Sequence, residues 1–383
     1  MKKLLLIFVP IILIGIGATY LLLQKRPPIE TKFVQNNREQ ETRDGVQEGG
    51  EDLKDSEIVI NKPGNYALLE NPNHTYQTFN NCGPATLSMI LSWYGQEVSQ
   101  RELGDKMRPY QNSDGDNDDK TIFTYEFVDW ANVYGFEAID KVNGDIELLK
   151  TFTANGIPVV VKTWLHVGDD IGHFRIVRGF DERGENLPAG RQVIIQDDSY
   201  EGPNKKISYF DFLSMWQPFN YAYIIVYTPE QKDLVEGIVG EESKENVDWQ
   251  NALIRAQKEA ELDPENVYPH FNMSTSYYHL GDYQKSAEAF ERVENRLPRR
   301  MLWYQIEPIQ AYVELGNYNR AFQISDNIIA NGNRAFSELY QLRGEYYLSI
   351  GDDITAKEQF ELAILFNENF EAAKISLESL LNN

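Results

Sequence analysis

Cysteine is almost absent from this sequence. Cys82 is the only one among 383 residues, so the chain cannot form an intramolecular disulfide. No cysteine lies directly after the apolar N-terminal stretch, which excludes a lipid attached to a cysteine there. A lone cysteine is commonly a small buried apolar residue, but its thiol is also free for chemistry.

Basic residues are scarce as well. Lysine and arginine total 36 against 59 aspartates and glutamates, which gives a net charge of -23. Binding to nucleic acid depends on clustered basic side chains that neutralise phosphates. The composition therefore argues against a nucleic acid partner, and also against adhesion to an anionic membrane surface.

Long apolar runs are limited to one, at residues 4–23, which carry no charged residue. This run is long enough to cross a bilayer as a helix, and residues 15–18 are only a weak cleavage site. We expect an uncleaved transmembrane signal anchor over residues 1–27, followed by a flexible acidic linker at 28–57. Basic residues flank the run on both sides, but such an anchor most often leaves the soluble part extracytoplasmic, so the cell membrane is the expected location.

The pattern of a mixed domain begins at residue 58. Helices are predicted over residues 82–94 and then in three later stretches, 101–107, 123–134 and 146–155. Runs typical of strands follow at 158–164, 173–177, 193–196 and 221–227. Helices first and a mainly antiparallel sheet afterwards indicate an α+β domain over residues 58–230.

Beyond residue 230 the sequence becomes helical and repeats itself. Tyr277, Tyr312 and Tyr347 are 35 residues apart, and each is followed four residues later by a glycine. The pattern resembles the tetratricopeptide repeat, whose period is about 34 residues. We therefore expect a linker at 231–247 and an all-α repeat solenoid at 248–383.

Such solenoids usually bind a peptide or another protein on a concave face, so a protein partner is expected there. A passive spacer or an oligomerisation arm is the alternative. Residues 231–383 hold 26 acidic and 14 basic residues, a net charge of -12, so any groove there should prefer a neutral or basic partner.

The surroundings of Cys82 favour a reactive thiol. Asn81 is a good helix cap, and Pro84 suits a first helical turn because the amide that it lacks would have no partner there. Apolar residues then recur at helical spacing up to Gly95. Cys82 should therefore lie at a helix N-terminus, where the helix dipole and a nearby imidazolium lower a thiol pKa.

Three short motifs carry a resemblance to a known family. Residues 81–85 read Asn-Cys-Gly-Pro-Ala after an upstream Gln77, residues 172–180 begin Gly-His-Phe-Arg, and residues 194–198 read Ile-Ile-Gln-Asp-Asp. Over about residues 58–228 the chain resembles papain-like cysteine peptidases of the bacteriocin-processing, double-glycine-leader type. It resembles most closely the relatives that are not fused to a transporter.

The resemblance implies a papain-like fold and a Cys-His-Asp triad with an oxyanion-hole glutamine. On this sequence these residues are Cys82, His173, Asp197 and Gln77. Asp197 and Asp198 are adjacent on a strand end and must point to opposite faces. The family has an acid followed by proline at this place, which selects Asp197. Gln77 lies five residues before Cys82, where six is usual.

Five histidines could serve as the base. His173 opens a strand after a glycine and lies within the family motif, so it is favoured over His166, which lies between a strand and a loop. His74 is too close to Cys82 in sequence to approach it easily from the opposite wall. The other two, His270 and His279, fall in the repeats.

We therefore expect a cysteine peptidase that hydrolyses peptide bonds and whose repeats recruit a protein partner or substrate. A catalytically silent scaffold that binds peptides or proteins, and an acyltransferase that uses the same acyl-enzyme, are the alternatives. No cofactor is expected. Residues 114–119 begin like a calcium loop but lack the later glycine and glutamate, so a solvated loop is expected there and no metal.

Overall fold

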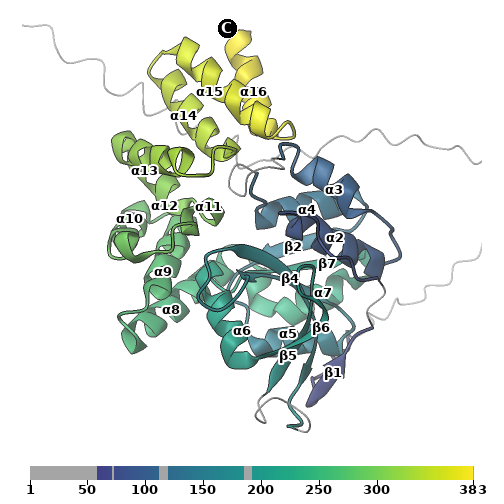
Figure 1. Cartoon of the computed structure of the whole chain (residues 1–383). Helices are drawn as coiled ribbons and strands as arrows, with labels where there is room; N and C mark the ends of the chain where they lie inside the picture. The colour runs from purple at the N-terminus through teal and green to yellow at the C-terminus, as the bar shows by residue number, and fades with distance from the viewer. Residues whose placement is uncertain (1–57, 71–72, 112–119, 185–191, 383) are drawn as a thin grey trace, which may run out of the picture. The chain divides into compact units, whose positions relative to one another are not determined.

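The computed structural model describes residues 58–70, 73–111, 120–184 and 192–382, and Glu57–Asn383 forms one compact unit. A mixed α/β domain comes first and a helical region follows it (Figure 1). Among these residues no helix is long and apolar enough to span a membrane. The predicted anchor at residues 1–27, the predicted linker at 28–57 and the acidic loop at 114–119 lie outside the described residues.

The sheet has seven antiparallel strands, and its order is β2-β7-β3-β4-β5-β6, with β1 paired to β4. The mainly antiparallel sheet predicted from the sequence is thus confirmed. The strands are β1 (Tyr66–Leu68), β2 (Glu137–Lys141), β3 (Val159–Trp164), β4 (Gly172–Asp181), β5 (Val193–Asp198), β6 (Gly202–Ser208) and β7 (Tyr223–Tyr227).

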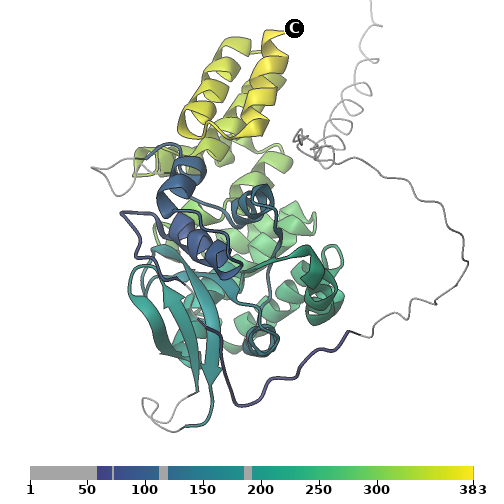
Figure 2. The same cartoon turned by 90° about the vertical axis from the view of Figure 1, so that its right-hand side faces the viewer.

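Helices cover both faces of this sheet (Figure 2). Val160 and Val161 are neighbours on β3 and point to opposite faces, as the period of a strand requires. Val160 packs with the first group of helices, and Val161 packs with the second. The first group is α2 (Cys82–Trp93), α3 (Gln100–Met107) and α4 (Thr124–Val133), and the second is α5 (Ile146–Ala154), α6 (Tyr209–Trp216) and α7 (Lys232–Val239).

Helix α7 corrects one predicted boundary. Residues 231–247 were expected to be a linker, but α7 occupies half of that range. Val235 is fully buried in the core that the sheet and α5 share. Helix α7 is amphipathic and packs its apolar face against this core. The packing of the α/β domain therefore continues to about residue 239.

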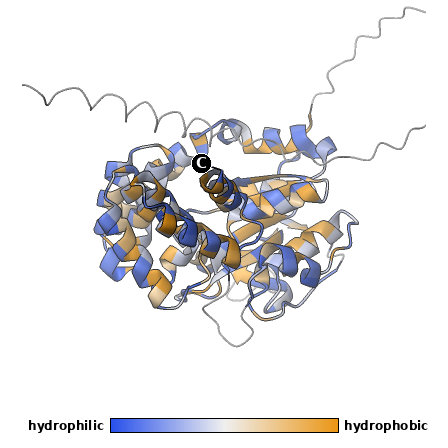
Figure 3. Cartoon of the chain, turned by 90° about the horizontal axis from the view of Figure 1, so that it is seen from above, coloured by the Kyte–Doolittle hydropathy of each residue, from blue (hydrophilic) through white to orange (hydrophobic). Residues whose placement is uncertain are grey.

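The repeats are confirmed as paired helices. They comprise α8 (Val247–Leu262), α9 (Val267–His279), α10 (Tyr283–Glu291), α11 (Met301–Tyr304), α12 (Glu307–Glu314), α13 (Tyr318–Ala330), α14 (Ser337–Ser349), α15 (Asp353–Phe366) and α16 (Glu371–Leu381). In three of the pairs a glycine lies between the two helices: Gly281, Gly316 and Gly351. Each adopts a φ of 70–79°, which is costly for other residues. Figure 3 shows polar and apolar residues side by side along these helices, as packing in pairs requires.

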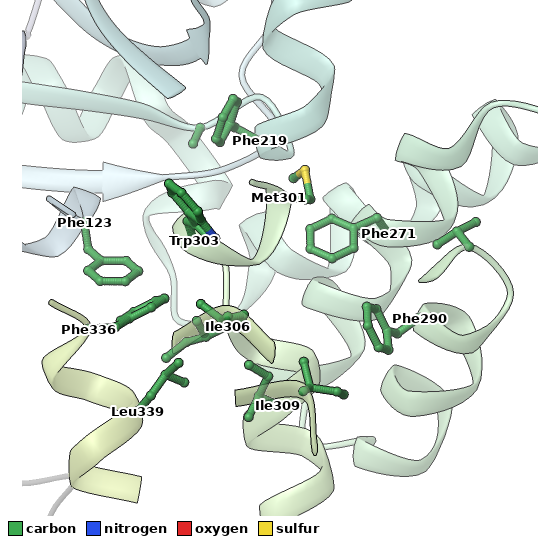
Figure 4. Packing of buried hydrophobic residues seen from close by; sticks show 14 of the residues in the cluster. Phe123, Phe219, Phe271, Phe290, Met301, Trp303, Ile306, Ile309, Phe336 and Leu339 are labelled. Carbon is green, nitrogen blue, oxygen red and sulfur yellow. The ribbon is translucent and has the colours of Figure 1, made fainter. Parts of the chain in front are cut away.

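One apolar core joins the repeats to the α/β domain (Figure 4). Phe123 and Phe219 from the α/β domain belong to the same cluster as Phe336 and Leu339 of the repeat region. Phe123 and Phe336 have ring centroids 6.1 Å apart. The repeats are therefore packed against a domain of their own chain.

Candidate active site

Cys82 is the first residue of α2, as the sequence predicts. The Asn81 side chain does not cap the helix, however, because it bonds instead to Gln100 and to Arg108. Thr86, one turn later, donates a hydrogen bond to the carbonyl oxygen of Phe174 on β4, at 3.3 Å. This contact holds the start of α2 against the strand that carries His173.

The His173 imidazole interacts with the thiol of Cys82. His173 is the second residue of β4 and is only 2% exposed. Its Nε2 lies 3.0 Å from Oδ1 of Asp198. The ring therefore lies between a sulfur and a carboxylate, with Nδ1 as the nitrogen left for the sulfur.

Asp198 is held by four groups. Oδ1 accepts hydrogen bonds from the backbone N–H groups of Tyr200 and Glu201, at 2.7 and 3.0 Å, besides facing His173. Oδ2 lies 2.8 Å from Nε of Arg175. Because the side chain of Asp198 is completely buried, this set of contacts fixes its position.

Asp197 does not meet His173, so the structure corrects the expected acid to Asp198. The pairing of β4 with β5 sets Asp198 opposite Arg175, which lies two residues from His173 and shares its face. Asp197 is opposite Ile176 and points to the other face. There it pairs with Nε of Arg178 at 2.6 Å and accepts a hydrogen bond from the backbone of Asn204.

These contacts favour a thiolate and an imidazolium. Burial raises the pKa of the Cys82 thiol, but the hydrogen bond and charge of His173, together with the Phe174 backbone and the charge of Arg108, outweigh burial, so that pKa lies below its usual value. Burial lowers the pKa of His173, but Asp198 and Cys82 together raise it above its usual value. Burial also raises the pKa of Asp198, and its contacts with His173 and Arg175 reverse this effect, so Asp198 keeps its negative charge.

Residues 65–224 match the Peptidase_C39 like family. The chain carries a C39-like domain followed by helices like those of tetratricopeptide repeats. No match was found among the curated proteins.

Solved structures that resemble the chain fall into the same two groups. A putative C39-like peptidase from Bacillus anthracis is 14% identical, with a TM-score of 0.34, over 43% of this chain and 98% of that one. The peptidase domain of Streptococcus ComA, a bi-functional ABC transporter involved in a quorum sensing pathway, is 19% identical, with a TM-score of 0.30, over 42% and 98%. A thermophilic TPR protein from Thermus thermophilus is 18% identical, with a TM-score of 0.30, over 35% and 74%.

Gln77 lies beside the segment that carries Asp198. Its backbone N–H donates to the carbonyl oxygen of Ser199 at 2.8 Å, and its Oε1 accepts from the Ser199 hydroxyl, also at 2.8 Å. Since Oε1 is used in this way, the Nε2 end of the side chain is the one able to donate to a substrate. Ser199 is next to Asp198, so one turn positions both the glutamine and the acid.

Three other histidines, His74, His166 and His279, have contacts away from Cys82. His166 lies between Asp169 and Glu201 on the surface, and His279 stacks on Trp249. His74 lies 3.0 Å from the backbone oxygen of Asp198, where it supports the acid's segment. The part of the chain that the structure describes holds no cluster of acidic, histidine and cysteine side chains suited to a metal ion.

Proposed function

We propose that the chain is a cysteine peptidase with Cys82 as nucleophile, His173 as base and Asp198 as the residue that orients His173. The observation that supports this proposal is the continuous series of contacts from the Cys82 thiol through the buried imidazole to the Asp198 carboxylate. Each contact is of the kind that nucleophile, base and orienting acid require.

The proposed reaction begins with the thiolate attacking a peptide carbonyl. His173, as an imidazolium, protonates the leaving amine and afterwards activates the water that releases the acyl group. Asp198 keeps the ring in place and stabilises its positive charge. The developing oxyanion is held by the backbone N–H of Cys82 and by the Nε2 of Gln77, and one such donor typically contributes about 3 kcal/mol.

Cleavage of a peptide library by the purified full chain in a mild detergent tests this proposal. The wild type is expected to cleave a subset of peptides, and Cys82→Ala is expected to cleave none, because removal of the sulfur prevents formation of the acyl-enzyme. Products are identified by mass spectrometry, and circular dichroism verifies that the variant folds. Equal cleavage by Cys82→Ala would show that a contaminant or a different residue performs the reaction.

The proposal includes a membrane anchor at residues 1–27, with the C39-like domain outside the cytoplasm. A membrane-impermeant thiol reagent is expected to modify Cys82 in intact cells, because a domain outside the cytoplasm is accessible to it. Cys82 is half-buried and is the single cysteine of the chain, so the labelling reports this site. Permeabilised cells give the full extent of labelling, and Cys82→Ala gives the background. Labelling that requires permeabilisation would place the domain in the cytoplasm.

The repeats keep a proposed role in recruiting a protein partner or substrate. Repeats of this type commonly bind proteins. Since one side of the repeats already contacts the C39-like domain, we place recruitment on the surfaces outside this contact. Their negative charge favours a neutral or basic partner.

A further inference from the structure

Lys162 is a buried cation that the proposed mechanism leaves without a role. It lies in the middle of β3 and is 4% exposed. Its Nζ is 5.4–5.7 Å from the centroids of four aromatic rings, which belong to Phe123, Phe174, Phe219 and Tyr304. At these distances each ring face attracts a cation. The one hydrogen bond of this ammonium group among the described residues goes to the carbonyl oxygen of Ile122, at 3.5 Å.

Two contacts place this ammonium group close to Cys82. Lys162 is paired with Phe174 across β3 and β4. A hydrogen bond from the backbone of Phe174 lowers the pKa of the Cys82 thiol. On the other side, Ile122 packs on Gly83, the residue after Cys82. A Cβ atom added to Gly83 would lie only 2.8 Å from the side chain of Ile122. Phe174 alone lies between Lys162 and Cys82 on the first route, and Ile122 and Gly83 lie between them on the second.

The repeats complete the enclosure of Lys162. Tyr304 of α11 packs on Gly172, the residue before His173, and a Cβ atom on Gly172 would be 2.8 Å from its ring. Arg300 forms an ion pair with Asp170 at 2.6 Å, and Gln305 donates to the carbonyl oxygen of Pro218 at 2.9 Å. These two contacts fasten α11 on either side of Tyr304.

The charges that face Lys162 come from several elements. Burial lowers the pKa of Lys162 to about 8, while the negative charges of Glu307, Cys82 and Glu126 oppose this effect and Lys120 adds to it. Glu307 is on α12, and its Oε2 is buried without a hydrogen-bond partner among the described residues. Burial also raises the pKa of Tyr304 to about 12, so its hydroxyl is neutral at pH 7.

We propose that Lys162 is a positioning residue for the reaction proposed above: its ammonium charge holds the Cys82 sulfur in the thiolate form, inside an enclosure that α11 and α12 of the repeats complete. The inference rests on the proposed function. A buried ammonium among aromatic rings is expensive compared with an apolar side chain of the same size. Packing alone therefore does not account for a lysine at this place, whereas the Glu307 carboxylate and a Cys82 thiolate together do.

The test follows the rate of Cys82 alkylation by iodoacetamide against pH, on the full chain in a mild detergent. This rate reports one site, because the chain has a single cysteine. Lys162→Met is expected to raise the thiol pKa by about one unit, the effect of a unit charge several ångströms away at an effective dielectric constant of about 20. At a pH below the thiol pKa of both proteins, alkylation should slow about tenfold.

Lys150→Met is the matched control. Lys150 is also buried, and its Nζ lies 5.2 Å from the ring centroid of Phe180, but its ion pairs are with Glu147 and Glu182. Removing this charge should leave the Cys82 thiol pKa unchanged. Lys162→Arg keeps a charge at the site and should retain the lowered pKa of Cys82.

Each other outcome counts against one of the two proposals. If the Cys82 thiol of the Lys162→Met variant keeps the wild-type pKa, the role of Lys162 is overturned and the peptidase proposal is left intact. A wild-type Cys82 with an ordinary thiol pKa would instead contradict the peptidase proposal. Lys162→Gln, which can still donate to Ile122, serves if the methionine variant does not fold. If both neutral variants unfold beside a folded Lys162→Arg, the charge is structural and the positioning role is overturned.

Discussion

Asp198→Ala is expected to lower peptide cleavage about 10²–10⁴-fold, the usual contribution of a correctly held general base. The change removes the carboxylate 3.0 Å from His173 and with it the group that raises the pKa of the imidazole. The ring then loses both its orientation and the stabilisation of its charged form. The measurement is the turnover of a selected peptide by each folded variant, together with the rate of Cys82 alkylation at pH 6.

Asp197→Ala is the matched control for this change. Each substitution removes one buried aspartate and leaves one buried arginine without its ion pair, Arg175 in the first case and Arg178 in the second. Both variants should therefore lose stability to a similar degree, by about 3–5 kcal/mol. Only Asp198→Ala should lose turnover per folded molecule. Equal loss in both variants would contradict the assignment of Asp198.

Cys82 and Asp198 differ in how far the sequence specifies their places. The position of Cys82 at a helix N-terminus could be predicted, because the start of a helix depends on local sequence. Here the local signals are Pro84 and the apolar spacing after it. The choice between Asp197 and Asp198 depends on strand register, since neighbours on a strand face opposite ways. Register is set by the pairing of Asp198 with Arg175. An irregularity between Val177 and Gly179 shifts the register further along the two strands. No local sequence pattern predicts this irregularity.

Lys162 could not be recognised from the sequence for a related reason. It lies within residues 158–164, which the sequence predicts only as a buried strand. The rings around it belong to residues 123, 174, 219 and 304, and only tertiary packing brings these segments together. By contrast, the repeats were predictable, because a glycine with positive φ must recur wherever the helices of a pair turn.

Removal of the repeats is expected to unfold the C39-like domain. A chain that ends at residue 246 would expose the side chains that now pack on the repeats. Trp164 is 1% exposed, donates to the Tyr268 hydroxyl at 3.2 Å and meets the Tyr304 ring edge to face. Buried Asn220 would lose its hydrogen bonds to three groups of α9.

The size of this effect follows from the apolar side chains alone. Phe123, Trp164, Met215 and Phe219 belong to the shared core, and burying each is worth about 1.5–3 kcal/mol. Together they supply about 6–12 kcal/mol, which is comparable to the whole stability of a domain. Thermal unfolding followed by circular dichroism, and binding of a dye that reports exposed apolar surface, measure the loss.

Two further chains make the truncation experiment specific. A chain that starts at residue 57 keeps the compact unit Glu57–Asn383 and should unfold at the wild-type temperature. Residues 247–383 supplied as a separate chain should restore the fold of the truncated protein, because the contacts between the two parts are non-covalent apart from one connection. A chain ending at residue 246 with the wild-type unfolding temperature would contradict the shared core. It would also show that the C39-like domain folds around Lys162 without Tyr304 and Glu307.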